Sequence, residues 1–152
     1  MLFRSDLLDQ DWGVSANVWS CPSFNELARD GQDCERWNML NPNAEPRVPF
    51  VTQQLASHAG PVIASTDYIK SYCEQIRAFV PRGRAYKVLG TDGFGRSDFR
   101  SKLRCHFEVN RHYVVVAALK ALADEGSVPA TVVAEAIAKY GLNADKINPL
   151  YA

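Results

Sequence analysis

Apolar residues follow two spacings along the chain, one typical of strands and one typical of helices. Val14, Ala16 and Val18 alternate with polar or aromatic neighbours, which is the two-residue period of a half-buried strand. Residues 61–65 form a short apolar run that ends in small and polar residues, as expected for a buried strand of a parallel sheet. The pattern therefore predicts strands at residues 14–21, 61–65 and 86–90.

The remaining apolar residues recur at intervals of three and four positions, which predicts helices between and after the strands. Ser23 and Glu26 form a capping-box pattern, so a helix should begin there and be interrupted at Gly31. Residues 113–117 favour a strand by themselves, but their continuity with an alanine- and leucine-rich segment favours a helix. The other expected helices cover residues 5–12 with Ser5 as N-cap, 32–40, 50–57, 68–80 with Asp67 as N-cap, 97–103 with Ser97 as N-cap, 111–124 and 129–140.

This order of elements predicts an α/β fold. Successive strand–helix–strand units form parallel sheets that are joined by right-handed crossovers and covered by helices on both faces. A chain of 152 residues has the length of one ordinary domain. We expect a single domain over residues 1–152, built as three α/β/α layers around a mostly parallel sheet. Residues 41–49 contain three prolines and should form a long loop.

Composition and charge argue against several classes of protein. Lys plus Arg and Asp plus Glu each total 17, so no overall field draws the chain to nucleic acid or to anionic lipid. The longest apolar run, residues 113–119, is too short to span a bilayer, and we expect no membrane segment. Residues 1–8 lack the long apolar segment of a secretion signal, which indicates a cytoplasmic protein.

None of the common catalytic or metal-binding motifs is evident in the sequence. The four cysteines match neither a zinc knuckle nor a redox CxxC motif, and we expect buried or half-buried thiols. The three histidines lack the spacing of a helix-borne metal pair, so we expect surface or capping roles. Residues 90–98, GTDGFGRSD, follow a strand, where backbone amides can bind an anion. Their glycine spacing fits no nucleotide-binding motif and favours a turn that shapes a surface.

Residues 29–39 are dense in charges of both signs. One interpretation is a solvated helix face that is stabilised by side chains four positions apart. The alternative is a protein interface, because Arg, Trp and Met are enriched at such contacts. Arg36 and Trp37 would then be the anchors, and the glycine-rich loop supplies Asp92, Phe94 and Arg96 as further candidate interface residues.

Residues 26–40, ELARDGQDCERWNML, resemble the C-terminal domain of the homodimeric pyruvate dehydrogenases. The resemblance continues through ASTDY at 64–68, GTDGFGRSD at 90–98, HFEV at 106–109, YVVVAAL at 113–119 and NADKINP at 143–149. It implies a transketolase-type C-terminal domain in an enzyme that decarboxylates pyruvate on thiamine diphosphate and Mg²⁺. That enzyme passes the acetyl group to the lipoyl domains of an acetyltransferase core. The resemblance also implies a homodimer whose cofactor lies between the upstream domains of opposite subunits.

The resemblance carries no catalytic, cofactor-binding or metal-binding residue over to this chain. The family holds the magnesium of its cofactor with Gly-Asp-Gly and a later Asn, whereas Thr91-Asp92-Gly93 lacks the first glycine and Asn110 follows too soon. We expect a chain that is inactive alone, packs on the upstream domains and supports the dimer. Two alternatives remain: a docking or regulatory module for the acetyltransferase core, and the C-terminal domain of a transketolase.

Domains of this family begin with β-structure before the helix that residues 5–12 match. The sequence starts after that β-structure, and we expect a sheet truncated to about three strands. Unpaired backbone and apolar surface at the truncated edge should then cause self-association or marginal stability.

Overall fold

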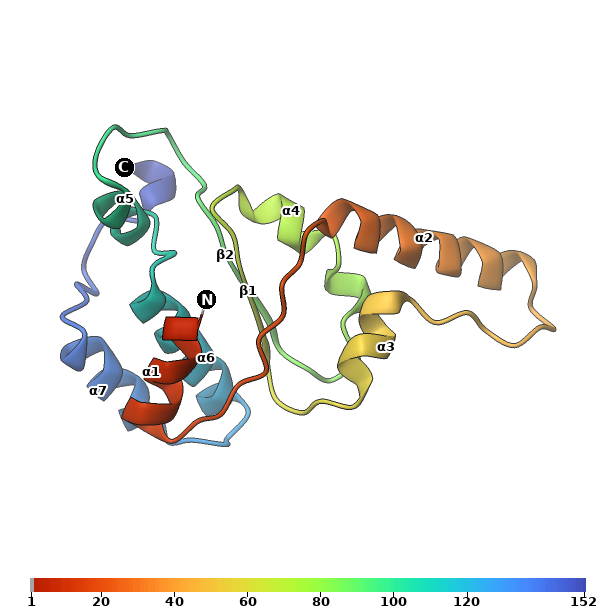
Figure 1. Ribbon diagram of the computed structural model, residues 1–152, viewed down its shortest axis with the longest axis horizontal. Coiled ribbons are helices and arrows are strands. Elements are labelled where there is room, and N and C mark those ends of the chain that lie inside the picture. The colour runs from red at the N-terminus through yellow and green to blue at the C-terminus, as the bar shows by residue number, and fades with distance from the viewer. Residues whose placement is uncertain (1) are drawn as a thin grey trace.

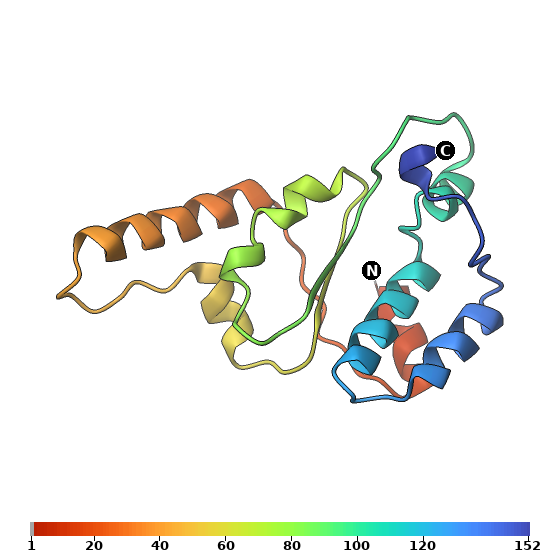
Figure 2. The same cartoon turned by 180° about the vertical axis from the view of Figure 1, so that it is seen from behind.

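A computed structural model describes residues 2–152, with side chains from Ser5 onward (Figure 1). The strands β1 (Val62–Ser65) and β2 (Tyr86–Leu89) form a parallel pair in which Val62 lies opposite Tyr86 and Ser65 opposite Leu89. One face of this pair is covered by α1 (Leu2–Trp12), α6 (Arg111–Asp124) and α7 (Ala130–Lys139). The other face is covered by α2 (Phe24–Leu40), α3 (Phe50–Ala56), α4 (Lys70–Glu74) and the 3₁₀ helix η1 (Arg77–Phe79). The helix α5 (Arg100–His106) and the 3₁₀ helix η2 (Pro149–Tyr151) lie together beyond one end of the sheet (Figures 1 and 2).

The strand side chains alternate between two apolar cores, one on each face of the sheet. Val62, Ala64 and Val88 pack against the first core, which buries Val51, Leu55, Ile76, Phe79 and Tyr86. Ile63 packs against the second core, which buries Leu8, Val115, Leu119, Val133 and Ala136. This alternation is the two-residue period of a strand that is buried on both faces. The predicted α/β class with three layers is therefore confirmed.

The start of α2 and the helical state of α6 agree with the sequence analysis. Ser23 Oγ accepts a hydrogen bond from the Glu26 backbone N–H at 3.2 Å, as the capping box predicts. At the start of α6, Asn110 Oδ1 accepts hydrogen bonds from two backbone N–H groups, those of His112 and Tyr113. The valine-rich segment is helical because Val115 and Leu119 reach the same core at a four-residue spacing.

The predicted strand at residues 14–21 is wrong, and the sheet in the described part of the chain has two strands where three were expected. Val14 donates its backbone N–H to the Leu8 carbonyl, but the N–H groups of residues 15–21 make no backbone hydrogen bond within residues 2–152. Val18 and Trp19 remain about half exposed. The alternating pattern therefore buries little apolar surface here, and little offsets the entropy lost on pairing. The segment passes the sheet as a connection between α1 and α2 (Figure 1).

Two predictions about helices also differ from the structure: the interruption at Gly31 and the continuous helix over residues 68–80. Gly31 lies inside a continuous α2, where a Cβ atom would come within 2.4 Å of the Phe79 ring. The glycine therefore permits close packing and does not end the helix. The predicted helix at residues 68–80 divides into α4 and η1, where the Phe79 N–H donates to the Ile76 carbonyl at 2.9 Å. This tighter turn places Ile76 and Phe79 in the same core.

Three predicted N-caps do not cap helices. Ser5 lies inside α1, which begins at Leu2. The helices α4 and α5 begin after Ile69 and Phe99, and neither has a side-chain cap. Asp67 and Ser97 are therefore not the N-caps of these helices. Within residues 2–152, every helix is too short or too polar to cross a membrane.

Candidate functional site

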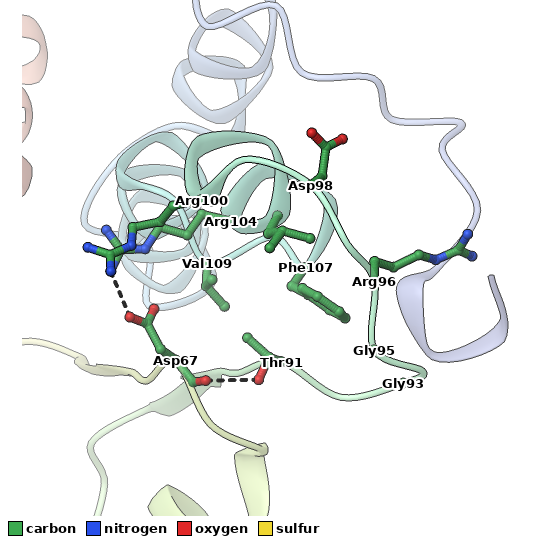
Figure 3. Close-up of a pocket in the computed structure, with 11 residues that line it drawn as sticks. Asp67, Thr91, Gly93, Gly95, Arg96, Asp98, Arg100, Arg104, Phe107 and Val109 are labelled. Carbon is green, nitrogen blue, oxygen red and sulfur yellow. Dashed lines mark hydrogen bonds and ion pairs between the residues drawn. The ribbon is translucent and has the colours of Figure 1, made fainter.

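A pocket of about 460 Å³ lies at the carboxyl ends of the two strands (Figure 3). Asp67 follows β1 and Thr91 follows β2, and both line the pocket. The chain leaves β1 toward the face that carries α4 and leaves β2 toward the face that carries α6. In parallel sheets, ligand crevices form beyond the carboxyl ends of neighbouring strands whose connections leave to opposite faces. The topology therefore indicates this end of the sheet as the expected place for a ligand site.

Asp67 and Arg104 join the end of β1 to α5. Arg104 Nη2 donates a hydrogen bond to Asp67 Oδ2 at 2.6 Å, and the two side chains form an ion pair. Thr91 Oγ1 donates to the Asp67 backbone carbonyl at 3.1 Å, and the Thr91 N–H donates to the Tyr68 carbonyl at 2.8 Å. These bonds hold the two strand ends and α5 together around the pocket (Figure 3).

A second arginine lies beside this ion pair. Arg100 precedes Arg104 by one helical turn, and Figure 3 shows both guanidinium groups at the same end of the pocket. Within the described residues, the exposed Arg100 side chain makes no hydrogen bond or ion pair. Asp98 also lines the pocket but points away from the two arginines and lies 4.0 Å from Lys102 Nζ. Asp67 therefore pairs with Arg104 and leaves Arg100 without an ion-pair partner among the described residues.

The apolar part of the pocket comes from the end of α5. Leu103, Phe107 and Val109 line it, and Val109 is fully buried. Lys146 Nζ donates a hydrogen bond to the Cys105 carbonyl at 3.2 Å, contacts the His106 carbonyl and lies 3.3 Å from Glu108 Oε1. These bonds satisfy carbonyl groups at the end of α5, which have no partner inside the helix. The C-terminal segment therefore helps to hold the pocket wall.

The glycine-rich loop forms another side of the pocket. Gly93 has a φ of 111° and lies so close to η2 that a Cβ atom would come within 2.4 Å of the Pro149 carbonyl oxygen. Glycine is required here for both reasons. Asp92 Oδ2 accepts a hydrogen bond from the Lys70 backbone N–H at 3.4 Å and lies 3.8 Å from Lys70 Nζ. The loop is thus anchored to α4 on one side and to η2 on the other.

The five candidate interface residues lie on two separate surfaces. Arg36 and Trp37 belong to the C-terminal half of α2, where the Arg47 guanidinium lies 4.3 Å from the centre of the Trp37 ring. Figures 1 and 2 show this half of α2 projecting away from the sheet, on the side opposite α5. Asp92, Phe94 and Arg96 lie in the glycine-rich loop, where Phe94 is 78% exposed and Arg96 lines the pocket.

The sequence did not identify Asp67, Arg100 and Arg104 as pocket residues. The spacing of the two arginines on one helix face directly after a glycine-rich turn was a usable signal. The pairing of Asp67 with Arg104 was not visible, because it depends on how β1 and α5 approach each other in space.

All four cysteines are free thiols, and within the described residues they take part in no metal-binding cluster. Cys34 and Cys73 are buried and Cys21 is half-buried, but Cys105 is exposed, contrary to the expectation for all four. Burial raises the pKa of the Cys73 thiol to about 11. No cluster of three or more His, Cys, Asp or Glu side chains within residues 2–152 could hold a metal ion.

The chain is similar to one protein family and to several bacterial proteins that share a name. The family described as "Transketolase-like TK C-terminal domain" matches residues 2–110. A protein from Haemophilus influenzae named "Pyruvate dehydrogenase E1 component" is 62% identical over 148 residues, which is 97% of this chain and 16% of that protein. Proteins of the same name from Pseudomonas aeruginosa and Escherichia coli K12 are 62% and 56% identical over 95% and 97% of the chain, again 16% of each relative. The chain thus spans about one sixth of the length of these relatives.

Proposed function

Because the chain belongs to the transketolase-like C-terminal domain family, we propose that it forms the C-terminal domain of a pyruvate dehydrogenase of the E1-component type. The whole enzyme would decarboxylate pyruvate and reductively acetylate the lipoyl groups of an acetyltransferase. The observation that carries this proposal is an identity of 62% over 97% of the chain to a protein of that name. The shared name of the three relatives makes a transketolase the weaker candidate.

We assign the thiamine diphosphate and Mg²⁺ of the proposed enzyme to its other domains. A magnesium ion bound to a diphosphate needs several oxygen ligands in near-octahedral geometry. In the loop that contains Thr91, Asp92 and Gly93, the Asp92 carboxylate already contacts the Lys70 N–H and lies near Lys70 Nζ. No metal-binding cluster of acidic, histidine or cysteine side chains occurs in the described residues. The residues of this chain therefore do not fit the cofactor.

The role proposed for the chain is to pack against the upstream domains and a second subunit of a homodimer. Exposed aromatic and aliphatic side chains support this role, because such groups gather where proteins meet. Phe94 in the glycine-rich loop, Phe99 directly before α5, and Ile147 and Tyr151 near the C-terminus are all mainly exposed. The single domain, the cytoplasmic location, the acetyltransferase partner and the lack of nucleic-acid or membrane partners belong to the same proposal.

A chimeric enzyme tests the proposal. This chain would replace the matching segment of the Haemophilus influenzae relative, and thiamine diphosphate-dependent decarboxylation of pyruvate would be measured on the purified protein. We expect an active dimer from the chimera. We expect no turnover from the relative without this segment or from the present chain alone.

The relative's own segment, rejoined at the same junction, is the matched control for the chimera. Two results would contradict the proposal. One is pyruvate turnover by the 152-residue chain alone. The other is a chimera that assembles like the control and binds its cofactor but does not decarboxylate pyruvate.

A further inference from the structure

We propose that the pocket at the carboxyl ends of β1 and β2 binds a small organic anion, a carboxylate or a phosphate monoester, through Arg100 and Arg104. The proposal rests on the pocket itself and does not depend on the enzyme to which the chain contributes. A volume of about 460 Å³ is within the range of small-molecule sites. The location beyond the ends of neighbouring parallel strands is also one where ligands bind in α/β folds.

The chain supplies one paired carboxylate for the two arginines at this end of the pocket. Arg104 is held by Asp67 at 2.6 Å, whereas Arg100 has no charged or hydrogen-bonding partner within residues 2–152. Their guanidinium groups lie at the same end of the pocket in Figure 3, so one positive charge is left over there. Guanidinium groups bind carboxylate and phosphate oxygens in pairs of parallel hydrogen bonds. An anion between Arg100 and Arg104 would neutralise the remaining charge.

Thr91, another polar residue that lines the pocket, limits the ligand further. Thr91 Oγ1 uses its hydrogen atom in the bond to the Asp67 carbonyl. In this arrangement the hydroxyl can accept a hydrogen bond from a ligand but cannot donate one. The negative charge of the ligand must therefore be met by the arginines.

The apolar floor indicates that the ligand carries an organic group. Leu103, Phe107 and Val109 line the pocket next to the arginines, and the Phe107 ring faces the open space in Figure 3. An inorganic anion would leave this surface in contact with water. An anion with a ring or short hydrocarbon chain would cover it and should bind more tightly, because apolar surface is removed from water.

Calorimetric titration of the intact protein with phenyl phosphate, benzoate and inorganic phosphate tests the proposal. We expect saturable binding of at least one organic anion, and weaker binding of inorganic phosphate. Phenyl phosphate and benzoate distinguish a phosphate monoester from a carboxylate as the preferred class. The substitution Arg100→Gln should weaken the binding about tenfold, as expected for the loss of a charged hydrogen-bond donor.

Arg82→Gln is the matched control, because Arg82 is exposed in the turn before β2 and does not line the pocket. It should change the affinity less than twofold. Phe107→Leu should reduce the preference for phenyl phosphate over inorganic phosphate while binding of inorganic phosphate persists. Arg100 is exposed and unpaired in the described chain, so its replacement should leave the circular dichroism spectrum unchanged.

Three results would overturn the proposal. The first is the absence of saturable binding of both organic anions. The second is an unchanged affinity in Arg100→Gln. The third is an equal loss of affinity in Arg100→Gln and Arg82→Gln, since binding would then follow the net charge of the protein and not this pocket.

Discussion

Replacing Gly31 with alanine should destabilise the protein, although alanine is the better helix former. In the interior of a helix, Gly→Ala alone contributes up to about 1 kcal/mol. At this position, however, the new Cβ atom would lie 2.4, 2.5 and 2.6 Å from three atoms of the Phe79 ring. Phe79 is buried in the core between α2, α3 and the sheet, so its ring cannot simply turn into solvent.

The expected loss follows from these two opposing effects. Overpacking a well-filled core costs about 1–3 kcal/mol, and three simultaneous overlaps with a buried ring place Gly31→Ala near the upper end. After subtraction of the helix gain, about 2 kcal/mol of the free energy of unfolding should be lost. For a chain of this length, that loss lowers the melting temperature by roughly 6 °C.

Urea unfolding monitored by far-ultraviolet circular dichroism measures the effect, with Phe79→Leu as the second arm of a double-mutant cycle. Leucine lacks the ring edge that the new methyl group would strike. In the Phe79→Leu background, Gly31→Ala should therefore be neutral or stabilising by up to about 1 kcal/mol. The reasoning is refuted if Gly31→Ala stabilises the protein equally in both backgrounds, because Phe79 then does not fill the space above Gly31.

Three further predictions concern the α1–α7 contact and the cysteines. Tyr140→Phe should cost about 1–2 kcal/mol, since the Tyr140 hydroxyl accepts from Trp12 Nε1 at 2.8 Å and donates to Asp11 at 2.9 Å. Tyr151→Phe, at a position that is 79% exposed, is the control in the same urea assay and should be neutral. Hydrogen bonds with Lys139 and Tyr140 lower the pKa of Asp11 below its ordinary value of 3.8. The ionised carboxylate therefore stabilises the fold at pH values above 3.8, and this stabilisation is lost as the pH falls through the lowered pKa. The melting temperature of Asp11→Asn should thus lie below that of the parent protein at neutral pH, and a difference that persists below this pKa would contradict the assignment. Cys105 is exposed and should react with a chromogenic disulfide reagent before the fully buried Cys73, whose pKa is raised to about 11; Cys105→Ser should remove the fastest phase, and a fast phase that remains would be evidence against this order.

Features that depend on neighbouring residues were predictable from the sequence. The N-cap at Ser23 and the helical spacing of residues 111–124 contain their own signals, and both are confirmed. The strands β1 and β2 were also predicted, because each is a short apolar segment between turn residues. These local patterns were sufficient for the α/β class and its layers.

Features that depend on distant residues were not predictable in this way. The segment at residues 14–21 alternates like a strand, but a strand exists only where a partner accepts its hydrogen bonds. The helix expected at residues 68–80 is broken where Arg77 donates hydrogen bonds to Glu74 and, at 3.0 Å, to the Tyr86 carbonyl. The role of Gly31 depends on Phe79.

The same limit applies to the candidate site. The sequence raised the glycine-rich loop as an anion site but favoured a turn that shapes a surface, and in the structure the loop borders the pocket. Its partners were not recognised, because Asp67 reaches Arg104 only after β1 and α5 are placed side by side.

The hydrogen bond between Trp12 and Tyr140 joins residues that are 128 positions apart, and it therefore has a consequence for biosynthesis. At typical rates of translation, α1 is made on the order of ten seconds before α7. During that interval Leu8 cannot be covered by Val133 and Ala136, its later neighbours in the core. A nascent chain that is stalled before α7 should consequently expose α1 to proteases and to chaperones. Once α7 has emerged from the ribosome and packed on α1, that exposure should end.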